Sequence, residues 1–94
     1  MKVDFIRHVR TSSSEVYGIL ENDIMIGRLD LHFSNDGRID GLVIFSKQLS
    51  KEDELKLCQK IDIEIVDEAE LDDNNFCITF ATVSNINVFG KDNK

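Results

Sequence analysis

The sequence contains no proline and no tryptophan, and only five glycines and two cysteines. A chain without proline and with so few glycines does not have the composition of a linker, a collagen-like repeat or a low-complexity tail. Cys58 and Cys77 are too few for a disulfide framework, and neither has a partner at the spacing of a zinc or redox motif. We therefore expect both to be small, buried core thiols.

Long hydrophobic runs are also missing. No stretch approaches the ~20 apolar residues of a membrane-spanning helix, and charges interrupt residues 1–8 too often for a signal peptide. We expect a cytoplasmic protein with no membrane partner. The length of 94 residues, with 41% hydrophobic and 31% charged residues, predicts one domain spanning 1–94, with 90–94 as a frayed tail.

The net charge of −7 comes entirely from one part of the chain. Residues 51–73 hold ten acidic side chains and three lysines, whereas positive and negative charges balance elsewhere. Such a surface repels phosphate, so direct binding of nucleic acid is not expected. The run is typical of a solvated helix face. Alternatively it is a docking patch for a basic protein partner, with Glu64, Asp67 and Glu68 as the candidate contacts, or a mimic of nucleic acid that binds a DNA-binding protein.

Alternating apolar residues predict β-strands through the first half of the chain. An edge strand is expected from Val3 to about Val9. Strands at 16–20, 24–33 and 38–45 follow, separated by hairpin turns at Asn22-Asp23 and at 34–37. The last three strands are predicted to form an antiparallel meander.

One helix is predicted after this meander. Ser50 is the expected N-cap, and Glu52 and Asp53 place negative charge in the first turn, where the helix dipole favours it. The apolar residues that share roughly half of the helical circumference are Leu55, Leu57, Cys58, Ile61, Ile65, Val66 and Ala69. Residues 61–66 also alternate as a strand would, and this alternative stays open.

A strand rich in β-favouring residues is predicted at 76–83, with a short closing strand at 86–89. The order of elements predicts an α+β fold. It consists of an antiparallel sheet of about five strands, built from the three-stranded meander, then the helix, then a C-terminal strand or hairpin, with the single helix packed across one face.

Apolar residues point to both faces of this expected sheet. The helix-facing set is Met25, Leu29, Leu31, Phe33, Ile39, Val43 and Phe45, and the opposite set is Ile24, Ile26, Leu42 and Ile44. One helix cannot cover two faces. We therefore predict a homodimer whose interface contains Ile24, Ile26, Leu42 and Ile44.

One cluster has residue types that an enzyme could use. Arg28, Asp30 and His32 alternate along a strand and so point to one face. A histidine oriented by a carboxylate can serve as a general base, and an arginine can hold an anionic substrate. The same pattern is common on solvated strands.

No motif for a cofactor or a metal is present. The preferred interpretation is a small, non-catalytic interaction or regulatory module. The alternatives are a small enzyme or ligand-binding domain that uses Arg28, Asp30 and His32 at a dimer seam, or the nucleic-acid mimic.

Overall fold

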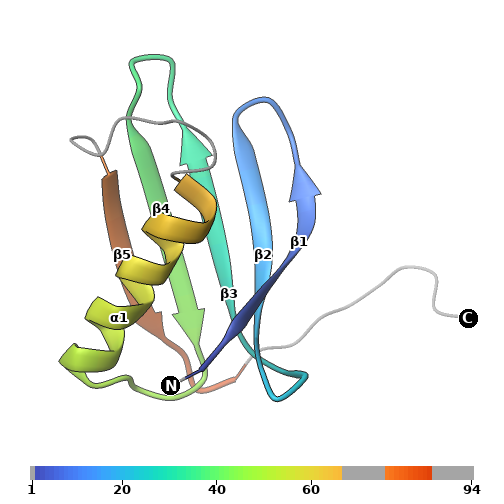
Figure 1. Ribbon diagram of the computed structural model, residues 1–94, viewed down its shortest axis with the longest axis vertical. Helices are drawn as coiled ribbons and strands as arrows, with labels where there is room; N and C mark the ends of the chain where they lie inside the picture. Colours follow the sequence, from blue (N-terminus) through green and yellow to red (C-terminus); the bar gives the residue numbers. More distant parts are fainter. Residues whose placement is uncertain (1, 67–75, 86–94) are drawn as a thin grey trace, which may run out of the picture.

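The computed structural model describes residues 2–66 and 76–85 (Figure 1). Its elements, in chain order, are β1 (Asp4–Arg10), β2 (Ser14–Glu21), β3 (Ile24–Phe33), β4 (Ile39–Phe45), α1 (Lys51–Ile61), the π-helical turn η1 (Asp62–Val66) and β5 (Phe76–Thr82). The expected closing strand at 86–89 and the expected tail at 90–94 lie outside the described residues.

The five strands form one sheet in the order β1-β2-β3-β4-β5. The first four strands make an antiparallel meander, and β5 lies parallel to β4. Within the described residues the α+β class, the five strands and the single helix are confirmed, but the prediction of a wholly antiparallel sheet is wrong at β5. After β4 the chain passes through α1 before it re-enters the sheet, and such a crossover returns it in the same direction.

The hairpin turns have the backbone geometry that their residues favour. Asn22 and Asp23 have φ angles of 53° and 66°, and Gly37 has a φ of 85°. Two consecutive residues with positive φ match the right-handed twist of the flanking strands, and asparagine and aspartate tolerate this conformation.

The helix begins where its cap was predicted. The Ser50 side chain accepts a hydrogen bond from the Asp53 backbone N–H at 3.1 Å. The chain stays helical through η1, so the strand alternative for 61–66 is wrong. Leu57, Ile61 and Ile65 are buried. Leu55 was also expected in the apolar arc, but it is exposed because it lies about 200° around the helix from Leu57.

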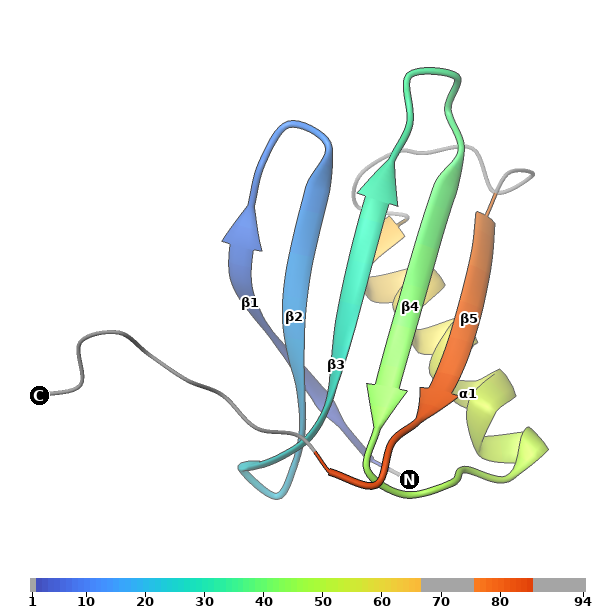
Figure 2. The same cartoon turned by 180° about the vertical axis from the view of Figure 1, so that it is seen from behind.

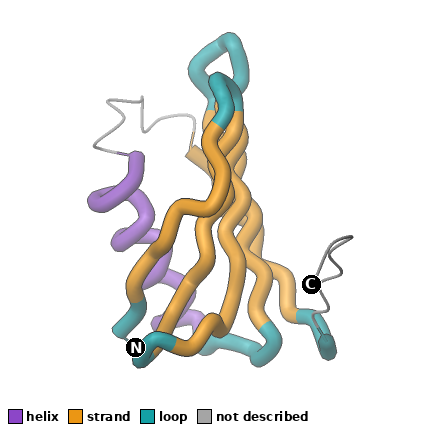
Figure 3. The backbone as a smooth tube through the Cα atoms, turned by 90° about the vertical axis from the view of Figure 1, so that its right-hand side faces the viewer, coloured by secondary structure: helices purple, strands orange, loops and turns teal. Residues whose placement is uncertain are grey.

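The core lies between α1 and one face of the sheet (Figures 1 and 3). The sheet residues that are fully or almost fully buried here are Ile19, Leu29, Leu31, Ile39, Val43 and Phe45. Five of them belong to the predicted helix-facing set, and Phe33 packs against the same cluster. The alternation in β3 and β4 therefore located most of the core.

A β-bulge at the start of β3 changes the face of the sheet to which its first side chains point. Ile19 pairs with Gly27 but Leu20 pairs with Met25, so Ile26 is an extra residue between them. Ile26 packs against the core. The Met25 Cε atom lies 2.8 Å from the position that a Cβ on Gly18 would occupy, on the face away from α1. The predicted faces of Met25 and Ile26 are therefore wrong, and they are exchanged.

Ile24 is affected by the same bulge. It alternates with Met25 and pairs with Glu21 next to the hairpin turn. Its position is therefore on the helix side at the tip of the β2–β3 hairpin, where it is 67% exposed. This corrects its predicted place beside Leu42 and Ile44.

Candidate functional site

The face of the sheet away from α1, called the open face below, is the candidate site. No element within residues 2–66 and 76–85 covers it (Figure 2). Register and alternation place the following apolar residues there: Ile6, Val9, Val16, Leu20, Met25, Leu42, Ile44 and Ala81. Ile6, Val9 and Met25 are about half exposed, at 49%, 48% and 55%. The open face thus exposes apolar side chains to water, alongside polar ones.

An ion pair lies among these apolar residues. Arg28 Nε donates to Asp30 Oδ1 at 2.7 Å. Both residues belong to β3, the central strand of the sheet. Asp30 is flanked in register by Val16 on β2 and Leu42 on β4, and only 20% of its side chain is exposed. The structure therefore brings together two of the three residues in the predicted polar cluster.

His32, the third residue, stays apart from this pair. It is exposed and lies opposite Ser14 on β2 and Asp40 on β4. The Asp40 carboxylate pairs with Arg38, with 3.3 Å between Arg38 Nε and Asp40 Oδ2. In the described part of the chain no hydrogen bond joins His32 to either carboxylate, so nothing orients its imidazole.

His8 lies on the open face in close contact with β2. Its Cε1 and Nε2 atoms are each 3.1 Å from the position of a Cβ on Gly18, and the end of Met25 approaches the same point. The missing side chain at Gly18 leaves room for both neighbours. The His8 and Met25 side chains thus cover the β2 backbone at Gly18, whose partners are Ile6 on β1 and Arg28 on β3.

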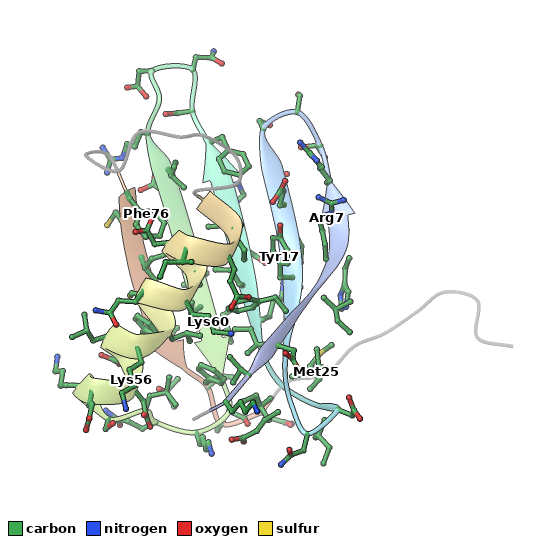
Figure 4. All side chains as sticks on the ribbon, viewed as in Figure 1. Arg7, Tyr17, Met25, Lys56, Lys60 and Phe76 are labelled. Carbon is green, nitrogen blue, oxygen red and sulfur yellow. The ribbon has the colours of Figure 1, made fainter. Side chains whose placement is uncertain are left out.

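A second polar cluster, which the sequence analysis missed, lies on the helix side of β1 and β2. Glu15 is buried with 8% exposed surface. Its carboxylate accepts a hydrogen bond from the Tyr17 hydroxyl at 2.6 Å and lies 3.3 Å from Arg10 Nε. Figure 4 shows Tyr17 and Arg7 on the neighbouring strands. Alternation puts Glu15 and Tyr17 on one face, but only the packing of β1 shows that the carboxylate is buried.

This cluster perturbs the only tyrosine of the chain. Burial, followed by the neighbouring Glu15 carboxylate, raises the pKa of Tyr17 to about 12. The Tyr17 ring also makes an edge contact with Phe5, with the centroids 6.3 Å apart. Because both Glu15 oxygens have partners in Tyr17 and Arg10, the buried carboxylate is satisfied within the fold.

Two acidic side chains of the helical segment form ion pairs within the described residues. Lys60 bonds to Glu64 at 2.5 Å, and Lys56 lies 3.6 Å from Glu52. Lys60 also lies above the Phe5 ring, 6.0 Å from its centroid. Of the candidate partner contacts, Glu64 is therefore engaged by a lysine, while Asp67 and Glu68 lie outside the described residues.

The cysteines differ from each other. Cys58 is half-buried, and burial, with a smaller contribution from Glu54, raises the pKa of its thiol. Cys77 is exposed, so its predicted core position is wrong. It alternates onto the open face of the edge strand β5, where it lies opposite Asp40. Residues 2–66 and 76–85 contain no group of three or more histidine, cysteine or acidic side chains that could hold a metal ion.

Comparisons with known proteins add no relative. No family model matches the chain, and searches of curated proteins and of solved structures found no match. Among the described helices none has the length and apolar character needed to cross a membrane.

Proposed function

We propose that this protein is a non-catalytic interaction module that works as a homodimer, with the open faces of two sheets packed against each other. The observation that carries the proposal is the apolar open face, on which Ile6, Val9 and Met25 are half exposed around a central ion pair. Exposed apolar surface of this extent is typical of interaction sites.

The size of the face suits such an interface. Five strands of seven to ten residues, spaced ~4.8 Å apart with a rise of ~3.3 Å per residue, cover roughly 550–800 Å². A standard stable interface buries about 800 Å² on each partner. Sheets that pack face to face lie about 10 Å apart, a distance that interdigitating aliphatic side chains fill.

The central ion pair favours a second copy as the partner. A two-fold axis between the sheets, perpendicular to β3, reverses the strand and places Arg28 of one copy opposite Asp30 of the other. Each copy then presents opposite charges to its partner at both positions. Matched charges of this kind set the register of an interface, because like charges facing each other cost several kcal/mol.

The first experiment compares two substitutions of exposed apolar residues. Met25→Glu introduces a charge on the open face, and we expect it to raise the dimer dissociation constant roughly 10- to 100-fold, from the loss of a buried methionine. Leu55→Glu is the control, because Leu55 is equally exposed but lies on the outer side of α1. Sedimentation equilibrium measures both. Equal effects, or a wild-type chain that is monomeric at high micromolar concentration, would contradict the proposal.

A charge-exchange experiment tests the orientation of the two copies. Arg28→Glu makes both central positions acidic, and Asp30→Arg makes both basic. We expect each variant alone to dimerise weakly, because like charges then face each other, and an equimolar mixture to form a heterodimer. If the mixture associates no better than its components, the two-fold arrangement of Arg28 and Asp30 is wrong.

The enzyme hypothesis receives less support from the geometry. A general base needs an imidazole held in reach of its substrate and oriented by a partner. Asp30 is instead bound to Arg28, and the His32 imidazole has no hydrogen bond within the described residues. We therefore place Arg28 and Asp30 in the interface rather than in a catalytic centre.

A further inference from the structure

The two edges of the sheet are built differently. The β1 edge carries Arg7, His8 and Arg10, and its pairing with β2 is interrupted by a bulge between Arg7 and Val9. Charged side chains and bulges are the usual devices that prevent an edge strand from pairing with another chain. The β1 edge is thus protected.

The β5 edge has none of these devices. Its seven residues, Phe76–Thr82, include no charged residue, no proline and no glycine, and they pair with β4 in unbroken register. Within the described residues no strand lies on the other side of β5. An edge strand directs part of its backbone N–H and C=O groups away from the sheet, where they can pair with a further strand.

The side chains of β5 are also incompletely covered. Phe76, Ile78 and Phe80 are half-buried on the helix side. Their register partners on β4, which include Ile39 and Val43, are completely buried. The difference arises because β5, in the described residues, has a neighbouring strand on one side only. A further strand with its own helix would complete the core at this edge.

We propose that β5 pairs antiparallel with β5 of a second copy, which joins two sheets into one continuous sheet. The two-fold axis is perpendicular to the sheet, so both helices lie on the same side. The second copy therefore supplies a strand for the backbone groups of β5 and also a helix beside Phe76, Ile78 and Phe80. An extended peptide would supply only the strand.

The pairing register follows from symmetry. Residues that lie opposite each other in an antiparallel pair point to the same face of the sheet. An axis perpendicular to the sheet also keeps each side chain on its own face. One residue of β5 must therefore lie opposite its own copy, with the axis passing between the two. Pairing over the whole strand places the axis at Thr79, the central residue of β5. Thr79 then lies opposite its own copy, and Cys77 lies opposite Ala81. Neither strand of this pair carries a charged residue.

Disulfide cross-linking tests this register. Thr79→Cys is made in a chain that also carries Cys58→Ala and Cys77→Ala, so that residue 79 is the only thiol. The control is the chain with Cys58→Ala alone, which keeps the exposed Cys77 on the same face two residues away. Oxidised glutathione is the oxidant: two protein thiols form one disulfide between chains, and the oxidant is reduced to two glutathione molecules. Non-reducing electrophoresis measures the rate at which the covalent dimer forms. This rate is divided by the rate at which the same thiol reacts with a small thiol reagent, so that differences in thiol reactivity cancel.

We expect the residue-79 thiol to form the covalent dimer on the order of tenfold faster than Cys77. In the proposed register the two copies of residue 79 meet at the Cα separation of about 4.4–6.8 Å that a disulfide requires. The two copies of Cys77 are displaced by four residues, or about 13 Å along the strand. Equal normalised rates, or no covalent dimer from residue 79, would overturn the proposal.

Two further measurements separate this pairing from other contacts. Packed open faces lie about 10 Å apart, which is too far for a disulfide between residues on the two facing sheets. Cross-linking at residue 79 should therefore persist in the Met25→Glu background, even if the open-face dimer no longer forms. The chain's own residues 86–94 are the alternative occupant of the β5 edge. If the residue-79 thiol cross-links rapidly only after these residues are deleted, the edge belongs to that segment and the proposal is wrong.

Discussion

Tyr17 shows how a single buried hydroxyl makes the stability of this fold depend on pH. Burial and Glu15 raise its pKa to about 12, compared with about 10 in an unfolded chain. Between these two values the unfolded chain loses the tyrosine proton while the folded chain keeps it. The folded state then binds more protons, so the free energy of unfolding falls as pH rises from about 10 to 12. Below pH 10 the contribution of this hydroxyl is fully present.

The titration can be assigned to one residue, because Tyr17 is the only tyrosine and the chain has no tryptophan. We expect the tyrosinate absorbance of the native protein to appear with a midpoint near pH 12, and that of the urea-unfolded protein near pH ~10. In Tyr17→Phe, the free energy of unfolding should fall less steeply than in the wild type as pH rises from about 10 to 12. A native midpoint equal to the unfolded one would show that the hydroxyl is not buried against Glu15.

Gly27 is the second residue whose role depends on its surroundings. A Cβ at this position would lie 2.7 Å from the Ile44 backbone oxygen and 2.7 Å from Phe45 Cδ1. Since the backbone of β4 cannot move without disturbing the sheet, we expect Gly27→Ala to lower the free energy of unfolding by about 1–3 kcal/mol. Urea denaturation measures this change.

Gly18→Ala is the matched control for Gly27. The atoms nearest to a Cβ on Gly18 belong to the side chains of Met25 and His8 on the open face, and these can shift. Its effect should stay below about 1 kcal/mol. If both alanine variants are equally stable, the close approach of β4 to Gly27 does not limit the side chain there.

The helix as an element depends on its first turn. Ser50 satisfies one of the backbone N–H groups that the start of α1 leaves without a partner in the helix. Ser50→Ala should therefore lower the free energy of unfolding by about 1 kcal/mol, seen as a lower urea midpoint with an unchanged slope. Ser12→Ala, in the exposed β1–β2 turn, is the control and should change stability by less than about 0.5 kcal/mol. Equal effects would show that the cap does not stabilise α1.

At the scale of the whole molecule, the two proposed contacts predict a closed assembly. The open face and the β5 edge each place the second copy by a two-fold axis, and two such axes generate four copies with no free interface where they meet at right angles. We expect light scattering to approach the mass of four chains as concentration rises, and Met25→Glu to stop at the mass of two chains. Growth beyond four chains would show that the two axes do not meet or that one of the contacts is not two-fold.

The sequence by itself determined the elements whose signals are local. Alternation in β3 and β4 identified Leu29, Leu31, Ile39, Val43 and Phe45 as core residues, Asn22 and Asp23 marked a hairpin, and Ser50 marked the start of the helix. These signals depend on residues close together in the chain, where side-chain period and backbone preference act directly.

Only the tertiary structure decided the features that depend on which segments meet. The bulge beside Leu20 exchanged the faces of Met25 and Ile26, because one extra residue reverses the alternation that precedes it. The direction of β5 followed from the crossover through α1, and the burial of Glu15 followed from the packing of β1 beside it. A pattern along one strand carries no information about its neighbour. The open face, with Leu42 and Ile44 on it, could therefore be expected from the sequence, whereas the positions of Met25, Ile24 and Ile26 could not.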